Sequence, residues 1–375
     1  MNATLARSEP IAFRSVTKAR LVTKPQSVAV ALIGPGGVGS ALLEQWRAVQ
    51  SKLEETCRKT LELRAICNSK RMFLSGSKLS IAQWDQLLSD STESPDFGKL
   101  TYFLHQHVGD VVIIDITASP EVASMHSEWL QCGFKVITAN KHGMASNHCA
   151  NIRRAEKLGG GSYFCETTVG AGLPILGVLT DLVRTGDDIQ KIEGVLSGTL
   201  SHLMRRVGNG EKFSHVLRDL HATGYTEPDP RIDLSGMDVA RKAVILGRMA
   251  GIDLSLSDVE VESLVPIEGC SALTVSQFIS RCEVWDDQLA RSAIEARSKG
   301  CVLQYVATIT RDGKARVAPV RISNVHQLAQ IPAGDNLVSI SSRRYAQSPL
   351  VIQGPGAGRE VTAAGLLADL IRLAD

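Results

Sequence analysis

The sequence predicts a two-domain α/β protein, with a doubly wound parallel sheet in the first part of the chain and an α+β domain after it. Three observations support this prediction. Short apolar runs alternate with helical patterns up to about residue 165, and a glycine-rich turn separates the first run from the first helix. The third observation is length, because single cores stop growing at roughly 250 to 300 residues and this chain has 375.

The predicted parallel sheet starts with a strand at 28–33 (VAVALI), since a nearly continuous apolar run is typical of a strand buried on both faces. A helix from Ser40 to about Gln50 follows the glycine turn. Another helix begins at Pro120, a residue favoured at the first helical position, and runs to about Gln131. Three further strands are expected, at 61–67, 110–116 and 135–138.

After residue 165 the regular alternation is lost. A strand is expected at 189–196. The segment 224–242 (GYTEPDPRIDLSGMDVARK) should begin as a rigid extended loop, because Pro228 and Pro230 restrict their own φ and the conformation of the residues before them. From Ser235 onward its pattern is helical. The chain ends in a strand, a glycine turn and a helix, expected at 350–352, 354–358 and 361–373.

Four segments follow from this pattern: a basic N-terminal tail at 1–27, a first domain at 28–165, a second domain at 166–350 and a C-terminal segment at 351–375. The tail has five basic side chains and one acidic side chain, with serines between them. Two interpretations of it are open, an organellar transit peptide and a plain disordered tail. The expected location is therefore the plastid or the cytoplasm.

The composition is that of an ordinary soluble globular protein, with 44% hydrophobic residues, 21% charged residues and a formal net charge of +2. No nucleic-acid partner is expected, because there is no basic surplus. No membrane span is expected either, because no apolar run approaches the roughly 18 residues that a transmembrane helix needs. The eight cysteines form no CxxC pair and no zinc-type spacing, which indicates reduced thiols in a reducing compartment.

The glycine turn GPGGVG has the spacing GxGxxG and stands directly between a predicted strand and a predicted helix. Gly34 permits the tight turn, Gly36 lets a pyrophosphate approach the backbone, and Gly39 allows close helix packing. The amides near Gly37 and Val38 would face the anion at the helix N-terminus. The sequence therefore predicts a dinucleotide site, and a structural glycine turn without a ligand is the alternative.

The end of the second predicted strand indicates which dinucleotide is bound. NAD-binding domains usually place an acid here to hold the ribose hydroxyls, whereas this chain has Asn68, followed by Lys70 and Arg71. No carboxylate would repel a 2′-phosphate, and two cations could receive one. NADPH is therefore favoured over NADH, unless Lys70 and Arg71 belong simply to a solvated loop.

The segment 224–242 carries the acids and the lysine that an amino-acid substrate would need. Glu227 and Asp229 each directly precede a proline and therefore lie on a rigid, extended loop. Asp238 and Lys242 are four residues apart on one helix face. Such a loop can hold an ammonium group with its acids and offer a lysine beside it. The alternative is a solvated surface with an ordinary ion pair.

Six motifs occur in an order that resembles the homoserine dehydrogenase family from about Val28 to the C-terminus. The likeness extends both to the short fungal form and to the dehydrogenase half of the plant bifunctional aspartate kinase and homoserine dehydrogenase. The motifs are GPGGVG at 34–39, Asn140-Lys141, ETTVGAGLP at 166–174, LSGTLSHL at 196–203, the segment 224–242, and QGPGAGREVTAAG at 353–365.

The resemblance implies reversible NAD(P)H-dependent reduction of L-aspartate 4-semialdehyde to L-homoserine, in the pathway to threonine, methionine and isoleucine. It implies that 28–165 is a Rossmann-like dinucleotide-binding domain and that 166–350 is a catalytic and dimerisation domain. The segment 351–375 should return to the first domain. A homodimer is expected by the same likeness.

The resemblance also implies roles for individual residues. Lys242 matches the proton-donating lysine, and Lys141 matches a lysine near the nicotinamide and the substrate. Substrate-binding positions are Gly198, Thr199, Gly224, Glu227, Asp233 and Asp238. Cofactor-binding positions are Gly34, Gly36, Gly37, Val38, Gly39, Asn68, Arg71, Thr117, Lys141 and Gly358. A sodium ion or similar monovalent cation would be held by Glu166, Val169, Ala171 and Leu173.

The chain departs from the family pattern at Ile232, where the usual sequence EPDPRDDLSG has an acid. Ala139 and His142 depart from the commoner PNKK. The change at Ile232 leads to an alternative hypothesis, a catalytically impaired nucleotide-binding relative that acts as a binding or regulatory subunit. A dehydrogenase for another small amino aldehyde is a third possibility.

Overall fold

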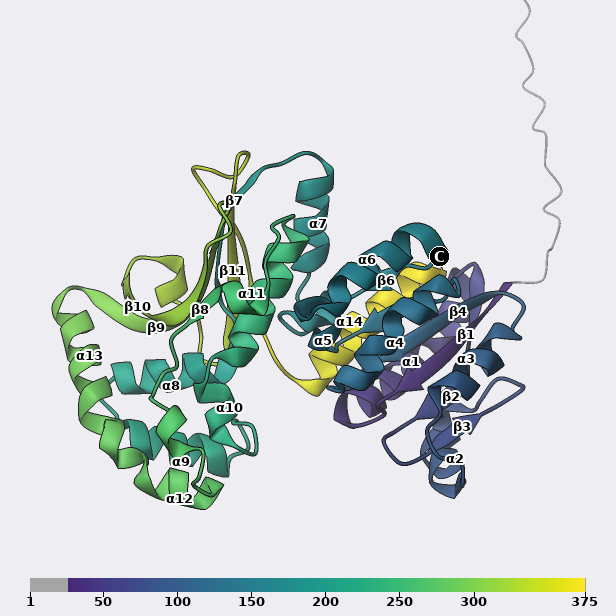
Figure 1. Cartoon of the computed structure of the whole chain (residues 1–375), viewed down its shortest axis with the longest axis horizontal. Coiled ribbons are helices and arrows are strands. Elements are labelled where there is room, and N and C mark those ends of the chain that lie inside the picture. The colour runs from purple at the N-terminus through teal and green to yellow at the C-terminus, as the bar shows by residue number, and fades with distance from the viewer. Residues whose placement is uncertain (1–25, 375) are drawn as a thin grey trace, which may run out of the picture.

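The structure is a computed structural model, and it describes residues 26–374. The predicted basic tail lies outside these residues except for its last two positions, which belong to the first strand. The described chain forms two lobes, each built around one six-stranded sheet (Figure 1). Within residues 26–374, no helix combines the length and the apolar character needed to cross a membrane.

The first sheet has the strand order β3-β2-β1-β4-β5-β6 and is parallel except for β3, which runs antiparallel to β2. Its centre is β1, whose residues Val28 to Ile33 are at most 2% exposed. This burial on both faces is what the continuous apolar run predicts. The strands are β1 (Gln26–Ile33), β2 (Lys59–Cys67), β3 (Met72–Leu74), β4 (Asp110–Asp115), β5 (Lys135–Thr138) and β6 (Tyr163–Phe164).

Helices cover both faces of the first sheet, which confirms the doubly wound prediction. Val28, Val30 and Leu32 of β1 pack in one apolar cluster with the first and last helices, while the alternate residues of β1 pack on the other face with α3, α4 and α6. The helices of this lobe are α1 (Gly37–Thr56), α2 (Trp84–Asp90), α3 (Phe97–His105), α4 (Pro120–Gln131), α5 (Lys141–Ala145) and α6 (His148–Gly159).

The second sheet has the order β12-β11-β7-β9-β10-β8 and is antiparallel except between β8 and β10. Helices α8, α11 and α13 pack on one of its faces. Its strands are β7 (Ile189–Val195), β8 (Val259–Val261), β9 (Cys301–Thr310), β10 (Ala315–Ser323), β11 (Asp335–Ser342) and β12 (Leu350–Pro355). Its helices are α7 (Leu176–Arg184), α8 (Gly198–Gly208), α9 (Phe213–Ala222), α10 (Pro230–Leu234), α11 (Met237–Met249), α12 (Val275–Arg281) and α13 (Asp286–Ser298).

The last helix, α14 (Arg359–Ala374), returns to the first lobe, as Figure 1 shows in yellow. It packs along α1, and Ala363, Leu366 and Leu370 are fully buried there. Gln45 of α1 donates hydrogen bonds to the backbone and the side chain of Glu360 at 2.9 and 3.0 Å. The C-terminal segment thus returns to the first lobe through α14, whereas the residues up to Pro355 still belong to β12 in the second sheet.

Several predicted boundaries were wrong. The helix expected at 40–50 spans Gly37–Thr56, and the strand expected at 110–116 ends at Asp115. The segment before Ser235, expected to be an extended loop, contains the helix α10. The helix expected from Ser235 begins at Met237, because Gly236 adopts a left-handed φ of 71° between α10 and α11. Asp229 caps α10 by accepting a hydrogen bond from the Arg231 amide, and Pro230 occupies the first helical position. Short elements such as β3 and α2 have too little periodicity to be predicted.

Candidate active site

The glycine turn after β1 is tight at its ends and open in its middle. Gly34 has φ of 90°, and a Cβ there would lie 3.0 Å from Thr117 Cγ2. A Cβ on Gly39 would lie 2.7 Å from the Gly34 carbonyl oxygen, so the helix could not pack as closely. At Gly36 and Gly37 a Cβ would meet nothing within 4 Å. The protein itself therefore leaves this backbone uncovered at the N-terminus of α1, where Val38 follows, and an anion fits there.

The turn after β2 presents two cations and no acid. The Asn68 side-chain oxygen accepts hydrogen bonds from the backbone amides of Lys70 and Arg71, each at 2.8 Å. Both basic side chains are exposed, and neither forms an ion pair with any carboxylate in the described part of the chain. Asn68 therefore shapes the turn through its side chain, and the guanidinium of Arg71 remains available to a ligand.

The end of β4 is organised by Asp115, which is completely buried. Its carboxylate accepts a hydrogen bond from the Thr117 amide at 2.8 Å and another from the Asn140 side-chain amide at 2.9 Å. It also lies 2.9 Å from Nε2 of the buried His126, whose Nδ1 contacts the Tyr163 hydroxyl at 3.0 Å. This network fixes Thr117 beside the glycine turn. The sequence analysis missed Asp115 and His126, although an acid ending an apolar strand was a visible signal.

Asn140 connects this hydrogen-bond network to α5. Its side-chain oxygen accepts a hydrogen bond from the His142 amide at 3.1 Å, which caps the helix that begins at Lys141. The other end of α5 is held by Arg248 of α11, which donates to the carbonyl oxygens of Met144 and Ser146 at 2.6 and 2.7 Å. The short helix with Lys141 is thus fixed between the two lobes.

Three predicted charged residues meet at the junction of α5 and α11. Lys242 Nζ lies 2.9 Å from one carboxylate oxygen of Asp238, as the four-residue spacing predicted. Lys141 Nζ lies 3.2 Å from the other oxygen of the same carboxylate. Lys242 also donates a hydrogen bond to the Leu196 carbonyl oxygen at 2.6 Å. Asp238 therefore joins two lysines from different lobes.

Burial and neighbouring charges set the ionisation of this cluster. Burial lowers the pKa of Lys242, and the charge of Lys141 lowers it further, while Asp238 acts in the opposite direction. Burial works against ionisation of Asp238, but Lys242 and Lys141 outweigh it and hold the pKa of that carboxyl well below its usual range. The result is an ionised carboxylate beside an ammonium group that gives up its proton more readily than a lysine in water.

The loop before α10 forms a second group of predicted substrate residues. The Glu227 amide donates a hydrogen bond to Asp233 at 2.8 Å, and Thr199 Oγ1 donates to the Tyr225 carbonyl oxygen at 2.9 Å. Gly224, with φ of 70°, and the Glu227 side chain are exposed. Burial, followed by the charge of Glu227, raises the pKa of Asp233 to about 6, although the Glu227 amide opposes the shift.

Gly198 and Gly358 lie in two different turns. A Cβ on Gly198, at the start of α8, would lie 2.9 Å from the Gly334 carbonyl oxygen. Gly358, in the turn before α14, has φ of 127°, and its carbonyl accepts hydrogen bonds from Thr362. Ile232 is 50% exposed, so it does not close off the site from solvent.

The predicted cation residues lie in the loop between β6 and α7. Glu166 is buried, and its carboxylate accepts hydrogen bonds from the amides of Ile175, Leu176 and Gly177 at 2.6 to 2.8 Å. This carboxylate therefore caps the start of α7, a role that the sequence analysis missed. Ala171, with φ of 54°, is the one non-glycine residue with a positive φ in the described chain. The Leu173 carbonyl accepts a bond from Ile175 at 2.9 Å.

Comparison with known proteins shows the family to which the chain belongs. Residues 34–166 match the family model described as homoserine dehydrogenase, NAD binding domain, and residues 174–371 match the homoserine dehydrogenase model. The chain belongs to the homoserine dehydrogenase family. The resemblance drawn from six sequence motifs is thereby confirmed.

Some relatives in the homoserine dehydrogenase family are much longer than this chain, and others are of about the same length. The Zea mays protein named bifunctional aspartokinase/homoserine dehydrogenase 2, chloroplastic, is 39% identical over 95% of this chain, which spans 39% of that relative. Across such bifunctional relatives the chain spans less than half of their length. The Schizosaccharomyces pombe homoserine dehydrogenase is 34% identical over 92% of this chain and 95% of its own length.

Solved structures show the same fold. A Candida auris protein of unknown function has a TM-score of 0.86 and 34% identity, covering 93% of this chain and 98% of its own. A hyperthermophilic archaeal homoserine dehydrogenase in complex with NADPH has a TM-score of 0.72 and 21% identity, covering 92% of this chain and 97% of its own. The latter likeness concerns the fold.

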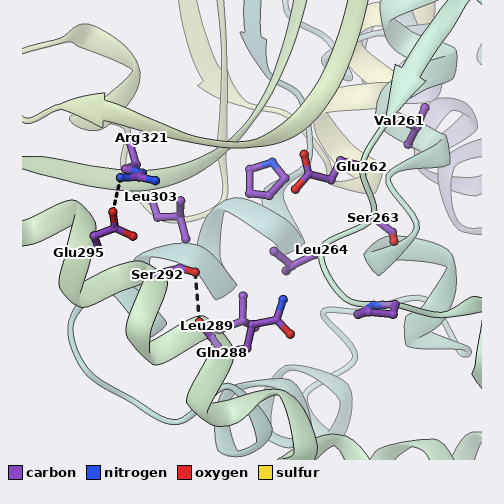
Figure 2. A pocket seen from close by; sticks show the side chains of 12 residues that line it. Val261, Glu262, Ser263, Leu264, Gln288, Leu289, Ser292, Glu295, Leu303 and Arg321 are labelled. Carbon is purple, nitrogen blue, oxygen red and sulfur yellow. Dashed lines mark hydrogen bonds and ion pairs between the residues drawn. The ribbon is translucent and has the colours of Figure 1, made fainter.

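One hollow of about 520 Å³ lies away from these residues, between α13 and strands β8 to β10 (Figure 2). Leu264, Leu289 and Leu303 contribute apolar side chains to it. Its charged groups are already paired, since Arg321 lies 2.7 Å from Glu295. None of the predicted site residues lines this hollow, so it is not the site that the family motifs form.

Proposed function

We propose that this protein catalyses the reversible reduction of L-aspartate 4-semialdehyde to L-homoserine, with NADPH preferred. The observation that carries the proposal is the position of the buried Lys242. Its ammonium group is held by Asp238 and by the Leu196 carbonyl oxygen, and the same Asp238 carboxylate also contacts Lys141. A bound nicotinamide supplies a hydride to the aldehyde carbon, and the carbonyl oxygen must then receive a proton. Lys242 is the group proposed to donate it.

Lys242 has the donors that this role requires. An ammonium group has three N–H bonds, and Leu196 and Asp238 account for two of them. The third can point to the aldehyde oxygen. Burial lowers the pKa of Lys242, which favours proton release, while Asp238 keeps the lysine oriented and charged before the reaction.

The substrate's ammonium group is assigned to Glu227 in the loop before α10 and to Asp233 in α10. Glu227 is exposed and has no ion pair with a described cation. The carboxylate of Asp233 accepts a hydrogen bond from the Glu227 backbone amide. Gly224 and the turn at Gly198 and Thr199 would add contacts beside them. Lys141, on the other side of Asp238, would contact the substrate and the nicotinamide.

The residues at the first sheet fit a dinucleotide phosphate. Gly36 and Gly37 leave the backbone uncovered, and the N-terminus of α1 offers its amides to an anion. Arg71 and the neighbouring Lys70 are free of described carboxylates and favour the 2′-phosphate of NADPH. Thr117 and Gly358 would complete the cofactor contacts. The archaeal homoserine dehydrogenase of the same fold was solved in complex with NADPH.

A monovalent cation, such as sodium, fits the loop that contains Glu166. Burial raises the pKa of Asp369 in α14 to about 6 and the charge of Glu166 adds to the shift, although Arg372, 2.6 Å from one carboxylate oxygen, opposes it. The other oxygen is buried without a hydrogen-bond partner. A positive charge beside them would stabilise both carboxylates. The Glu166 carboxylate and the carbonyls of Val169, Ala171 and Leu173 would hold the ion, whose role is to organise the junction between the lobes.

A homodimer is proposed from the family likeness and from the second sheet. The face of this sheet that is turned away from α8, α11 and α13 carries an apolar cluster that includes Val306, Ile322 and Leu337. Val302 and Val320 pack against it and are only half-buried. A second copy would cover this face.

The direct test follows NADPH absorbance after addition of aspartate semialdehyde, with NADH and a panel of other amino aldehydes as comparisons. We expect turnover that is fastest with aspartate semialdehyde and NADPH. Tight NADPH binding without turnover of any aldehyde would instead support the non-enzymatic relative. Faster turnover of another amino aldehyde would replace the proposed substrate.

A further inference from the structure

The strand β11 places the buried side-chain amide of Asn336 close to Lys242. Asn336, the second residue of the strand, is 0% exposed, and its side-chain nitrogen donates to the Leu196 carbonyl oxygen at 3.3 Å. The same oxygen accepts the hydrogen bond from Lys242. A carbonyl oxygen has two lone pairs, so Asn336 and Lys242 together use its acceptor capacity.

The opposite side of Asn336 contacts the turn that leads to α14. A Cβ on Gly356 would lie 1.9 Å from Asn336 Cγ and 2.2 Å from both terminal atoms of its amide. Only a residue without a Cβ fits there. Asn336 is therefore wedged between the Leu196 carbonyl and the turn that contains Gly358, and its side chain has little room to rotate.

The side-chain oxygen of Asn336 is buried without a hydrogen-bond partner. Buried polar groups are normally satisfied, and an exception needs an explanation. An apolar residue would avoid the unpaired acceptor but would give up the bond to Leu196. An aspartate would keep the shape but would place a second anion beside Lys242, where Asp238 already supplies one.

We propose that Asn336 is a positioning residue for Lys242: it occupies one lone pair of the Leu196 carbonyl and keeps this side of the ammonium group uncharged. The inference rests on the proposed proton-donor role of Lys242. The ammonium group is then restricted to the other lone pair and to Asp238, and its remaining N–H bond points to the substrate. The charged groups around it are Asp238 on α11, Lys141 on α5 and Asp233 on α10.

The test measures kcat/KM against pH for Asn336→Asp. A new carboxylate near Lys242 should move the alkaline limb of the profile upward by about one pH unit or more, because an opposite charge favours the ammonium form. Asn336→Ala should lower kcat roughly tenfold, the order expected when a general acid loses its orientation. The Kd for NADPH, followed by fluorescence, should stay within about twofold of the wild type, because both changes leave the turn at residues 34–39 untouched and add no bulk toward Gly356 in the turn before α14.

Ser342→Ala is the matched control, because Ser342 is a buried polar residue of the same strand that bonds to Asp187 far along β11. It should lower the melting temperature and leave the alkaline limb in place. An alkaline limb that Asn336→Asp does not move, or a kcat that Asn336→Ala does not lower, overturns the positioning role. Should Asn336→Asp not fold, the alanine variant decides alone.

Lys242→Ala separates this inference from the proposed function. If the wild-type alkaline limb persists in Lys242→Ala, the assignment of the proton donor fails and the inference fails with it. If the limb disappears in Lys242→Ala and is unmoved in Asn336→Asp, the proton donor stands and only the role of Asn336 is refuted.

Discussion

The two halves of the proposed site differ in which groups form them. The cofactor half, at the end of β1, consists mainly of backbone: two glycines that pack tightly, two that leave the chain uncovered, and the amides that begin α1. The substrate half consists of side chains, with Lys141, Asp238 and Lys242 brought together from two lobes. The first half depends on local conformation, and the second half depends on how α5 and α11 are held against each other.

This difference predicts how each half responds to mutation. Backbone amides cannot be removed by a side-chain substitution, so the phosphate-binding turn is sensitive mainly to added bulk. The substrate half can lose one charge at a time, and every loss alters the ionisation of its neighbours. The two halves should therefore be separable by experiment.

The largest effect is expected from Lys242→Ala. Removing the proposed general acid should lower kcat by about two to four orders of magnitude, while the Kd for NADPH stays nearly unchanged. Stopped-flow and fluorescence titration measure the two quantities. A collapse of NADPH affinity would show that the halves are not separate and that Lys242 has another role.

The complementary change, Arg71→Ala, addresses only the cofactor half. Loss of a charge-assisted contact to the 2′-phosphate, worth about 1.5 to 3 kcal/mol, should reduce the preference for NADPH over NADH by roughly 10- to 100-fold. The ratio of kcat/KM for the two cofactors is the measurement. Lys78→Ala is the control, since Lys78 in the same lobe is paired with Glu54. An unchanged ratio would assign Arg71 to a solvated loop.

Asp233 should make the substrate half sensitive to pH. Its raised pKa of about 6 means that the carboxylate becomes protonated below pH 6 and can no longer attract an ammonium group. The value of kcat/KM should then fall about tenfold per pH unit, as for a single required ionisation. Asp233→Asn should flatten this limb. A limb that survives in the asparagine variant belongs to another group.

The same shift has a consequence for stability. Because the folded-state pKa of Asp233 lies above its unfolded value, its contribution to stability is present below about pH 4 and is lost as the pH rises through about 6. Asp233→Asn should therefore raise the melting temperature at pH 8 relative to the wild type, and the gain should vanish near pH 4. Thermal melts at the two pH values measure this difference.

The smallest effect is expected from Ile232→Asp, which restores the acid of the family pattern. Ile232 is 50% exposed, so a charge there acts through solvent and should raise kcat/KM by no more than about fivefold, corresponding to about 1 kcal/mol. Ile294→Asp on α13, at 57% exposure, controls for added surface charge. Equal kcat/KM values in the two variants would show that the departure at Ile232 is neutral.

Sequence patterns predicted the elements that depend on near neighbours. The strands β1 and β5, the start of α4 at Pro120 and the order of the motifs were recognised because periodicity and turn residues are local signals. The short helix α10 was missed, since its five residues follow two prolines that indicate an extended loop. The network around Asp115 and His126 was also missed, because its members come from separate elements.

The glycine turn and the pairing of Asp238 with Lys242 could be predicted from the sequence, because both follow from residues a few positions apart and from the fixed geometry of a helix. Three contacts became visible only in the folded chain: Lys141 reaches the same carboxylate, Arg248 donates hydrogen bonds to the end of α5, and Asn336 shares a carbonyl with Lys242. These contacts join residues far apart in the chain, and their distances are set by how two sheets and their helices pack.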